Sequence, residues 1–235
     1  GGSFYIRYSH PEWIPKINQG KELSDSIGVA PGQNNHPIGK VTVVYKKLGT
    51  VLDNYDFKKT AVIFSKDVNH FAYQVYDQSQ NQYLGILDGQ ILKRKEDNRD
   101  ASLIFGSQVF SPDSQNLAYI EYFGGLYRAV IGNKPGRLYL GVADVVFSPD
   151  SKHVAYTAGD SKNSFVVVDG IEGKKYLRIT SKVVFSPDSQ HVAYKALIDS
   201  NSEVTIVDGQ EGKIGKATYR DPVFSPDSQN VIYNV

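Results

Sequence analysis

The sequence FSPDSKHVAY, from Phe147 to Tyr156, decides the fold because the chain contains five versions of it. The copies begin at Phe64, Phe110, Phe147, Phe185 and Phe224. The last three steps between copies are 37, 38 and 39 residues, and the first step is 46 residues. A phrase that recurs at a nearly constant spacing indicates one structural unit that is repeated along the chain.

The residues around the third copy alternate between short apolar runs and turn-forming residues, which predicts antiparallel strands. We expect the strands at residues 145–147, 153–157, 165–168 and 175–179. Pro149 presets the first corner of a type I turn, and Asp169-Gly170 suits a tight hairpin. The same pattern places third strands at residues 83–87, 127–131 and 204–207 in other copies. Four-stranded sheets of this kind bury their faces by stacking around an axis, so we predict an all-β, single β-propeller.

The two ends of the chain suggest how the ring closes. The fifth copy provides two strands before Val235, while residues 41–45 and 51–57 resemble a third and a fourth strand that precede the first copy. We therefore predict five blades, closed by a composite blade from both chain ends, with residues 41–235 as the propeller. Residues 1–40 would form an irregular N-terminal extension, because prolines interrupt them. The alternative is six blades, with residues 1–40 contributing irregular strands.

The phrase Phe-Ser-Pro-Asp-Ser, followed by a Val-Ala-Tyr strand, resembles the WD40-like repeat of TolB-type β-propellers. The segments VVDGIEGK (167–174) and IVDGQEGK (206–213) are similar to a bacterial or archaeal branch of these repeats. The first copy departs from the pattern at Lys66 and Val68. The resemblance implies a prokaryotic protein of the periplasm, the cell surface or the secreted fraction. It also implies a protein-binding module, a substrate gate of a serine peptidase or, occasionally, a polysaccharide lyase.

The composition argues against several classes of partner. Lys plus Arg (26) and Asp plus Glu (25) nearly cancel, so we expect no nucleic-acid binding. No apolar run approaches the roughly 20 residues that cross a bilayer, so we expect no membrane insertion. Cysteine is absent, which excludes disulfides and thiol catalysis. We find no phosphate loop, nucleophile elbow or dinucleotide fingerprint, and we expect no cofactor.

Histidines and aspartates recur at equivalent positions, which raises the question of metal binding. His70, His153 and His191 follow the Ser-Pro-Asp-Ser turn in three copies. Equivalent positions on different blades lie too far apart to share one metal ion with bonds of about 2.1 Å. The aspartates of the turns stand where a turn needs a side-chain acceptor. We interpret both sets as structural and predict neither a metal site nor catalytic residues.

Binding is expected on the face where the loops differ from copy to copy, because recognition surfaces usually consist of variable loops on a rigid scaffold. At the mouth of the central channel we predict a ligand-binding rim of Lys59, Ser107, Asp144, Lys182 and Asp221. On the same face, Tyr122 and Phe123 are the candidate partner-binding residues, since aromatic side chains dominate interface hot spots.

These observations favour a non-catalytic binding or scaffold propeller that recognises a protein or peptide, with carbohydrate as a possible ligand. One alternative is a carbohydrate-active enzyme, a lyase or hydrolase that uses the polar residues at the channel mouth. Another is an excised or engineered fragment with no independent function, because the chain lacks methionine and opens with Gly1-Gly2-Ser3. A cytoplasmic location also stays open.

Overall fold

The structure is a computed structural model of the 235-residue chain. It describes residues 3–7, 18–19, 45–50, 55–56, 62–93, 102–104, 106–218 and 220–233. The chain divides into two compact units, Gly1–Tyr55 and Asp56–Val235. The repeats found in the sequence all lie in the second unit. Among the described residues, no helix is long and apolar enough to cross a membrane.

The first unit contains a small antiparallel sheet. Its strands are β1 (Ser3–Arg7), β2 (Asn18–Gln19) and β3 (Tyr45–Thr50), in the order β2-β1-β3. β4 (Tyr55–Asp56) lies at the boundary of the two units. Residues 41–44, 51–54 and 57, on which the prediction of the composite blade also depends, fall outside the described residues. The division into an extension and a propeller stays a prediction.

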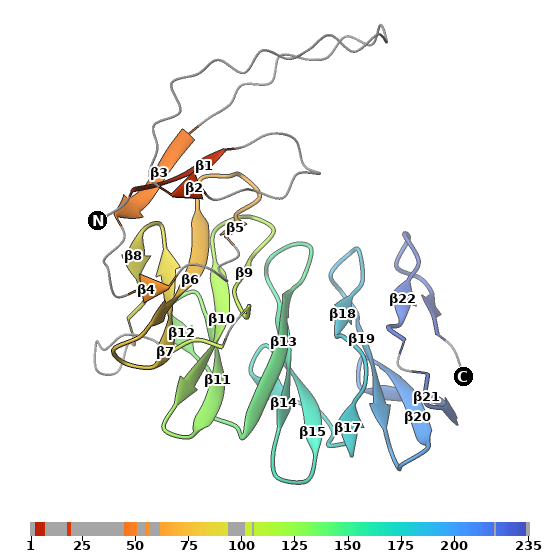
Figure 1. The fold of residues 1–235 in the computed structure, drawn as a ribbon. Helices are drawn as coiled ribbons and strands as arrows, with labels where there is room; N and C mark the ends of the chain where they lie inside the picture. Colours follow the sequence, from red (N-terminus) through yellow and green to blue (C-terminus); the bar gives the residue numbers. More distant parts are fainter. Residues whose placement is uncertain are drawn as a thin grey trace, which may run out of the picture. The chain divides into compact units, whose positions relative to one another are not determined.

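The second unit consists of antiparallel sheets that follow the repeats of the sequence (Figure 1). Repeat 1 contains β5 (Ile63–Phe64), β6 (Phe71–Asp77), β7 (Gln82–Leu87) and β8 (Gln90–Ile91). Repeat 2 contains β9 (Val109–Phe110), β10 (Leu117–Phe123), β11 (Leu126–Ile131) and β12 (Lys134–Pro135). Repeat 3 contains β13 (Gly141–Phe147), β14 (Val154–Gly159), β15 (Ser164–Val168) and β16 (Ile171–Glu172). Repeat 4 contains β17 (Arg178–Ile179), β18 (Val184–Phe185), β19 (Val192–Leu197), β20 (Ser202–Val207) and β21 (Gln210–Lys216). Repeat 5 contains β22 (Val223–Phe224) and β23 (Val231–Ile232). The prediction of an all-β chain with four-stranded antiparallel sheets is confirmed.

The Ser-Pro-Asp-Ser segment forms a turn that its own side chains hold together. The Ser148 hydroxyl donates to Asp150 Oδ1 at 2.6 Å and accepts the His153 N–H at 2.9 Å. The hydrogen bond from Ser148, followed by one from the Lys152 N–H, lowers the pKa of Asp150 to about 2. The same serine-to-aspartate bond occurs in the other four copies. The interpretation of these aspartates as turn acceptors is confirmed.

The second serine of the turn links each repeat to the one before it. Ser189 adopts a left-handed conformation with φ of 67°, and its hydroxyl accepts the Asp150 N–H of repeat 3 at 3.0 Å. Equivalent bonds at 2.9 to 3.1 Å join the other consecutive repeats, with Ser114, Ser151 and Ser228 as acceptors. We call this series the serine ladder. In repeat 1 the same position is Val68, with φ of 61° and no hydroxyl to accept a bond.

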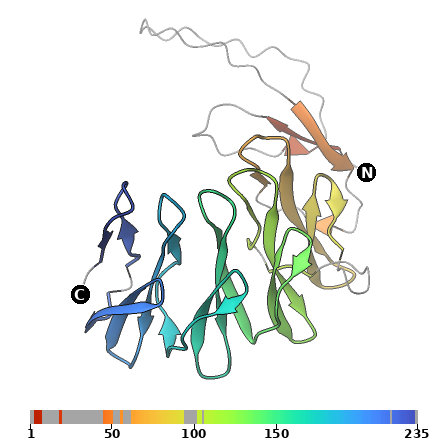
Figure 2. The ribbon, with the colours of Figure 1, turned by 180° about the vertical axis from the view of Figure 1, so that it is seen from behind.

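Short junction segments join consecutive sheets through backbone hydrogen bonds, so the sheets stand next to one another in chain order (Figure 2). The Tyr176 N–H donates to the Ser164 carbonyl of repeat 3, and the next residue, Leu177, donates to the Leu197 carbonyl of repeat 4. The predicted fourth strand at 175–179 is therefore only partly correct. Its second half, β17, pairs with β19 of the following sheet, because the chain crosses to the next repeat at residue 177.

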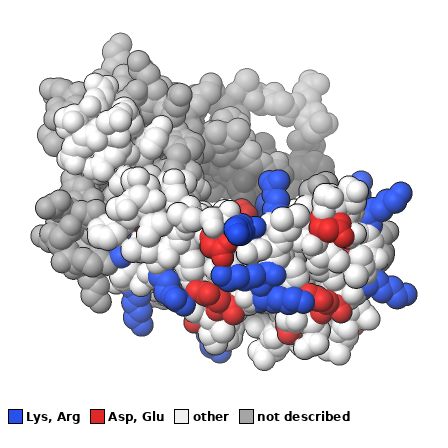
Figure 3. Space-filling view, turned by 90° about the horizontal axis from the view of Figure 1, so that it is seen from below, with Lys and Arg blue, Asp and Glu red and all other residues white. Residues whose placement is uncertain are grey.

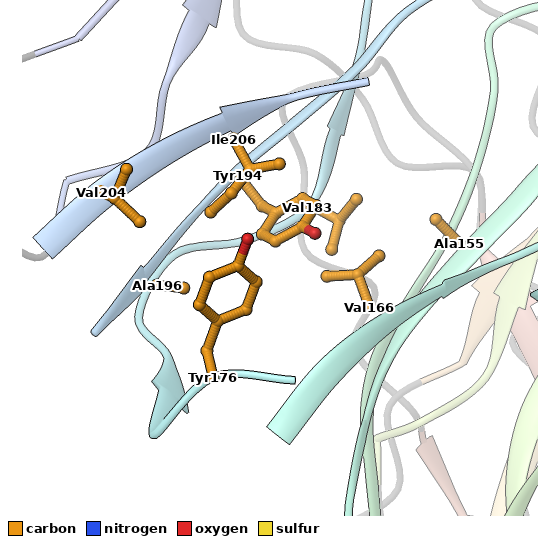
Figure 4. Packing of buried hydrophobic residues seen from close by; sticks show 8 residues of the cluster. All are labelled: Ala155, Val166, Tyr176, Val183, Tyr194, Ala196, Val204 and Ile206. Carbon is orange, nitrogen blue, oxygen red and sulfur yellow. The ribbon is translucent and has the colours of Figure 1, made fainter. Parts of the chain in front are cut away.

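The core lies between the faces of consecutive sheets and is built from small and aromatic residues. The cluster between repeats 3 and 4 contains Ala155, Val166, Tyr176, Val183, Tyr194, Ala196, Val204 and Ile206 (Figure 4). The alanine of the Val-Ala-Tyr strand has no exposed surface in repeats 1 to 4. Gly173 is also required by this packing, since an added Cβ would lie 3.0 Å from the Val166 carbonyl oxygen.

Candidate functional site

The two ends of the strands carry different chemistry. The Ser-Pro-Asp-Ser turns lie at one end, and the loops between the second and third strands lie at the other end (Figure 1). We call the second of these the loop end. Seen from the loop end, acidic and basic side chains alternate over the surface (Figure 3). Ion pairs in this part of the chain include Lys175 with Asp160 at 2.6 Å and Lys174 with Glu211 at 2.7 Å.

The structure brings together only some of the residues predicted for the channel rim. The Lys182 N–H donates to Asp221 Oδ1 at 2.9 Å, which links repeats 4 and 5. Asp144 is exposed at an irregularity in β13, where its φ is 54°. The Ser107 hydroxyl accepts the Ile120 N–H at 3.0 Å and serves the backbone of β10. Lys59 lies outside the described residues. A ligand-binding rim therefore stays a prediction.

Tyr122 and Phe123 end β10 at the loop end of repeat 2. Gly124 and Gly125, with φ of 61° and 89°, make the tight turn into β11 that holds both aromatic residues at the tip. Tyr122 is 43% exposed, and its ring lies 5.3 Å from that of Tyr127. The Phe123 ring lies under the guanidinium group of Arg128 at 4.9 Å. Both aromatic side chains are thus held in place by their neighbours before any partner binds.

Repeat 1 carries a similar aromatic pair at the same end of its strands. Tyr76 and Tyr83 face each other across β6 and β7, with ring centroids 5.2 Å apart. A junction segment connects this pair to repeat 2: the Leu103 N–H donates to the Tyr83 carbonyl, and the Tyr122 N–H donates to the Ser102 carbonyl. Aromatic pairs of two neighbouring repeats therefore flank one short stretch of backbone. In the sequence, this segment is distinguished only as one of the loops that differ from copy to copy.

The three repeated histidines each bind an aspartate at the turn end. Nδ1 of His70, His153 and His191 lies 2.6 to 2.7 Å from Oδ2 of the aspartate in the neighbouring Asp-Gly turn, Asp88, Asp169 and Asp208 respectively. The other oxygen of each aspartate accepts a backbone N–H of the second strand. In the described part of the chain, no group of three or more His, Asp or Glu side chains is arranged to hold a metal ion.

We predict that His191 titrates above the ordinary histidine value. The hydrogen bond to Asp208 raises the pKa of His191 above 6.5, although burial opposes the shift. The protonated form is favoured in the folded state, so its stabilisation is complete below pH 6.5 and is lost as the pH rises through the folded pKa. Proton NMR titration should place the pKa above 6.5 in the wild type and lower it in Asp208→Asn. An unchanged value in Asp208→Asn would contradict this, and Asp221→Asn is the control variant.

The sequence analysis missed a buried ion pair in repeat 4. The side chains of Lys195 and Glu203 are only 1% and 3% exposed, and Lys195 Nζ lies 3.2 Å from Glu203 Oε2. Lys195 also donates to Thr218 Oγ1 at 2.7 Å, and Thr180 donates to Glu203 Oε1 at 2.6 Å. Burial alone would raise the pKa of Glu203, but bonds from Thr180, Thr218 and Lys195 outweigh it and lower that pKa. The only signal in the sequence is a lysine at the position where the other four copies carry Gln74, Ile120, Thr157 and Asn234.

Comparisons with solved structures found proteins of distantly similar fold. Solved structures similar to this chain include TolB from Acinetobacter baumannii, with 13% identity and a TM-score of 0.45, which covers 99% of this chain and 57% of that one. The Dos1 propeller has 10% identity and a TM-score of 0.47, covering 80% of this chain and 55% of that one. Prolyl oligopeptidase B from Galerina marginata has 13% identity and a TM-score of 0.43, and the match covers 73% of this chain and 31% of that one. In fold, the chain resembles β-propellers.

These likenesses are weak, so the fold description rests on the strands and registers of the chain itself. No protein-family model and no curated protein matches the chain. The chain spans just over half the length of the TolB and Dos1 structures, at 57% and 55%. Propellers support many unrelated functions, and the function of each depends on the residues of its binding surfaces.

Proposed function

We propose that the second unit is a non-catalytic binding module that recognises a protein or peptide through the loop end of repeats 1 and 2. The observation that carries this proposal is the aromatic hairpin at which Tyr122 is exposed and Phe123 is half-buried under Arg128. An aromatic side chain that is already fixed by its neighbours loses little conformational entropy on binding. Tyrosine also combines a large apolar surface with a hydroxyl group, which suits it to interface hot spots.

The neighbouring aromatic pair supports an extended ligand rather than a compact one. Tyr76 and Tyr83 belong to the adjacent repeat, and the backbone of Ser102 and Leu103 bridges the two pairs. A peptide that crosses the two repeats would meet an aromatic surface twice.

A peptide selection tests the proposal. Peptides selected from a random library on the 235-residue protein should bind Tyr122→Ala at least ten-fold more weakly, as measured by calorimetry. Leu177→Ala is the matched control, because Leu177 is a comparably exposed apolar residue, at 51% against 43% for Tyr122. Peptides that bind Tyr122→Ala as tightly as the wild type, or that depend on Leu177, would refute the proposal.

We further propose that the unit closes as five blades, with repeat 5 next to repeat 1. The described parts of the predicted outer strands pair elsewhere, β3 with β1 and β4 with β6. The serine ladder runs from each aspartate N–H to the following serine, and closure would bring the Asp227 N–H to Val68. An apolar contact would then replace the hydrogen bond of the other interfaces. Exposed apolar side chains support this: Val68 is 45% exposed, and Val223 and Ile232 in repeat 5 are 60% and 69% exposed.

Engineered disulfides test the closure, because the chain contains no cysteine. A cysteine pair at positions 68 and 227 should form an intramolecular disulfide, detected by mass spectrometry after digestion without reductant. The matched control pair is Asp188→Cys with Ser228→Cys, since the Asp188 N–H and the Ser228 hydroxyl lie 3.1 Å apart. A control pair that crosslinks while positions 68 and 227 stay reduced would contradict five blades.

A further inference from the structure

A groove opens between repeats 3 and 4 at the turn end, away from the aromatic hairpin. Its volume is about 470 Å³. The apolar lining comes from Val166, Val168, Phe185, Val192 and Tyr194. These residues belong to facing sheets that pack against each other below the groove. The volume is sufficient for two or three amino-acid side chains, and the lining suits aliphatic ones.

The floor of the groove carries the hydroxyl group of Tyr194, which no described side chain or backbone group binds. Tyr194 is only 4% exposed, and its ring packs edge-on against Tyr176 at 6.4 Å. Figure 4 shows Tyr194 extending from repeat 4 toward Val166 of repeat 3. Its hydroxyl has no hydrogen-bond partner among the described residues, whereas the Tyr176 hydroxyl donates to Glu211 at 2.9 Å. A tyrosine hydroxyl that faces the groove without a protein partner can donate to a ligand that offers an acceptor.

The rim of the groove carries three carboxylates and two histidines, His153 and His191. Its carboxylates are Asp169, Glu172 and Asp208, which are 42%, 29% and 45% exposed. Asp169 and Asp208 each bind a histidine, and Glu172 binds Arg137 at 2.8 Å. All three keep exposed surface beside the apolar lining. A cation held above the groove would therefore meet several partly desolvated carboxylates at once.

An equivalent groove between repeats 1 and 2 has a similar apolar lining but lacks the carboxylates. Its volume is about 370 Å³, and Leu87, Leu117 and Tyr119 form its apolar lining. Its polar lining residues are Gln90, Lys93, Gln115 and Asn133, with no carboxylate among them. A groove at this position is thus a consequence of how consecutive sheets stack. The carboxylates belong to the groove between repeats 3 and 4 and are not required by that stacking.

We propose that the groove between repeats 3 and 4 binds a peptide segment in which a lysine or arginine lies between aliphatic residues. The aliphatic side chains enter the apolar lining, the cation faces Glu172 and Asp208, and a peptide carbonyl accepts the Tyr194 O–H. This site is separate from the loop end, and it does not depend on the function proposed there.

Two capped tripeptides test the proposal: acetyl-Leu-Lys-Leu-amide, and acetyl-Leu-Gln-Leu-amide as the neutral control. In ¹⁵N-labelled wild-type protein, the lysine peptide should shift the amide signals of Gly173, Gln190 and Gly209. Those of Gly132 and Asn133, in the equivalent groove, should stay in place. We expect the lysine peptide to bind about five-fold more tightly than the glutamine peptide, because exposed carboxylates gain modestly from a nearby cation.

Matched variants then assign the contacts. Tyr194→Phe keeps the packing and removes the hydroxyl, so it should weaken the lysine peptide about five-fold, as expected for one lost hydrogen bond. Tyr119→Phe removes the equivalent hydroxyl between repeats 1 and 2 and should change nothing. Glu172→Gln should reduce the preference for lysine over glutamine without affecting the neutral peptide.

Several results would overturn the proposal. They are equal binding of the two peptides, signal shifts at Gly132 and Asn133 as large as those at Gly173, and an unchanged affinity in Tyr194→Phe. Loss of binding in Tyr122→Ala would move the peptide to the loop end, which contradicts this inference while supporting the function proposed above. If Tyr194→Phe failed to fold, Glu172→Gln and the two wild-type titrations would still decide the question.

Discussion

Replacing Lys195 with methionine should destabilise the second unit by about 3–5 kcal/mol, the usual cost of removing one partner of a buried ion pair. Methionine keeps the apolar stem of the side chain but leaves the Glu203 carboxylate buried without its cation. The Thr180 hydroxyl and the N–H and hydroxyl of Thr218 would still donate to Glu203, so the ionised form would keep three neutral donors and no charge partner. Urea unfolding followed by circular dichroism measures the loss.

The double variant Lys195→Met with Glu203→Leu is the control for this prediction. It removes both charges, and similar replacements in other proteins are neutral or stabilising. Its stability should return to within about 1 kcal/mol of the wild type. A single variant that loses less than about 1 kcal/mol would show that water reaches Glu203 and that the pair is not a buried one.

Enlarging Ala155 to isoleucine should cost about 2–3 kcal/mol by overpacking the interface between repeats 3 and 4. Ala155 has no exposed surface and lies in the same cluster as Tyr194 and Val166. The added atoms would push two sheets apart, because packed interiors have little free volume. Thermal unfolding by calorimetry gives the size of the effect.

Ala143→Ile is the matched control, because Ala143 is an exposed residue of β13 in the same repeat. Its effect should stay within about 0.5 kcal/mol, as is usual for surface substitutions. If Ala155→Ile were equally mild, the sheets would be free to separate, and the close packing described for this interface would be incorrect.

The sequence predicted the features that are local to one repeat. The turn at Ser148–Ser151 followed from residue types that bond the nearby backbone, and the strand after it followed from its apolar residues. The histidines were correctly placed at the start of the second strand. Their aspartate partners were not predicted as partners, because the two residues lie 16 to 18 positions apart and meet only after the sheet has formed.

Features that depend on two repeats could not be predicted in the same way. The crossing of the chain at residue 177 depends on the position of the next sheet, which no single repeat encodes. The Lys195–Glu203 pair was also missed, because a lysine in a strand is normally taken to face solvent. For the candidate sites, the sequence could suggest Tyr122 and Phe123 from their residue types. It gave no indication of the groove that forms between two repeats.

The serine ladder gives the row of repeats a direction. At each described interface the earlier repeat supplies the N–H and the later repeat supplies the hydroxyl. Each interface is therefore asymmetric, and all the described interfaces have the same direction along the chain. Since each repeat is stabilised mainly by its two neighbours, a local defect is felt most strongly by the adjacent repeats. Loss of structure should then spread from the proposed interface of repeats 5 and 1, which lacks the serine hydroxyl, so repeat 3, the farthest from it, exchanges its amide protons last.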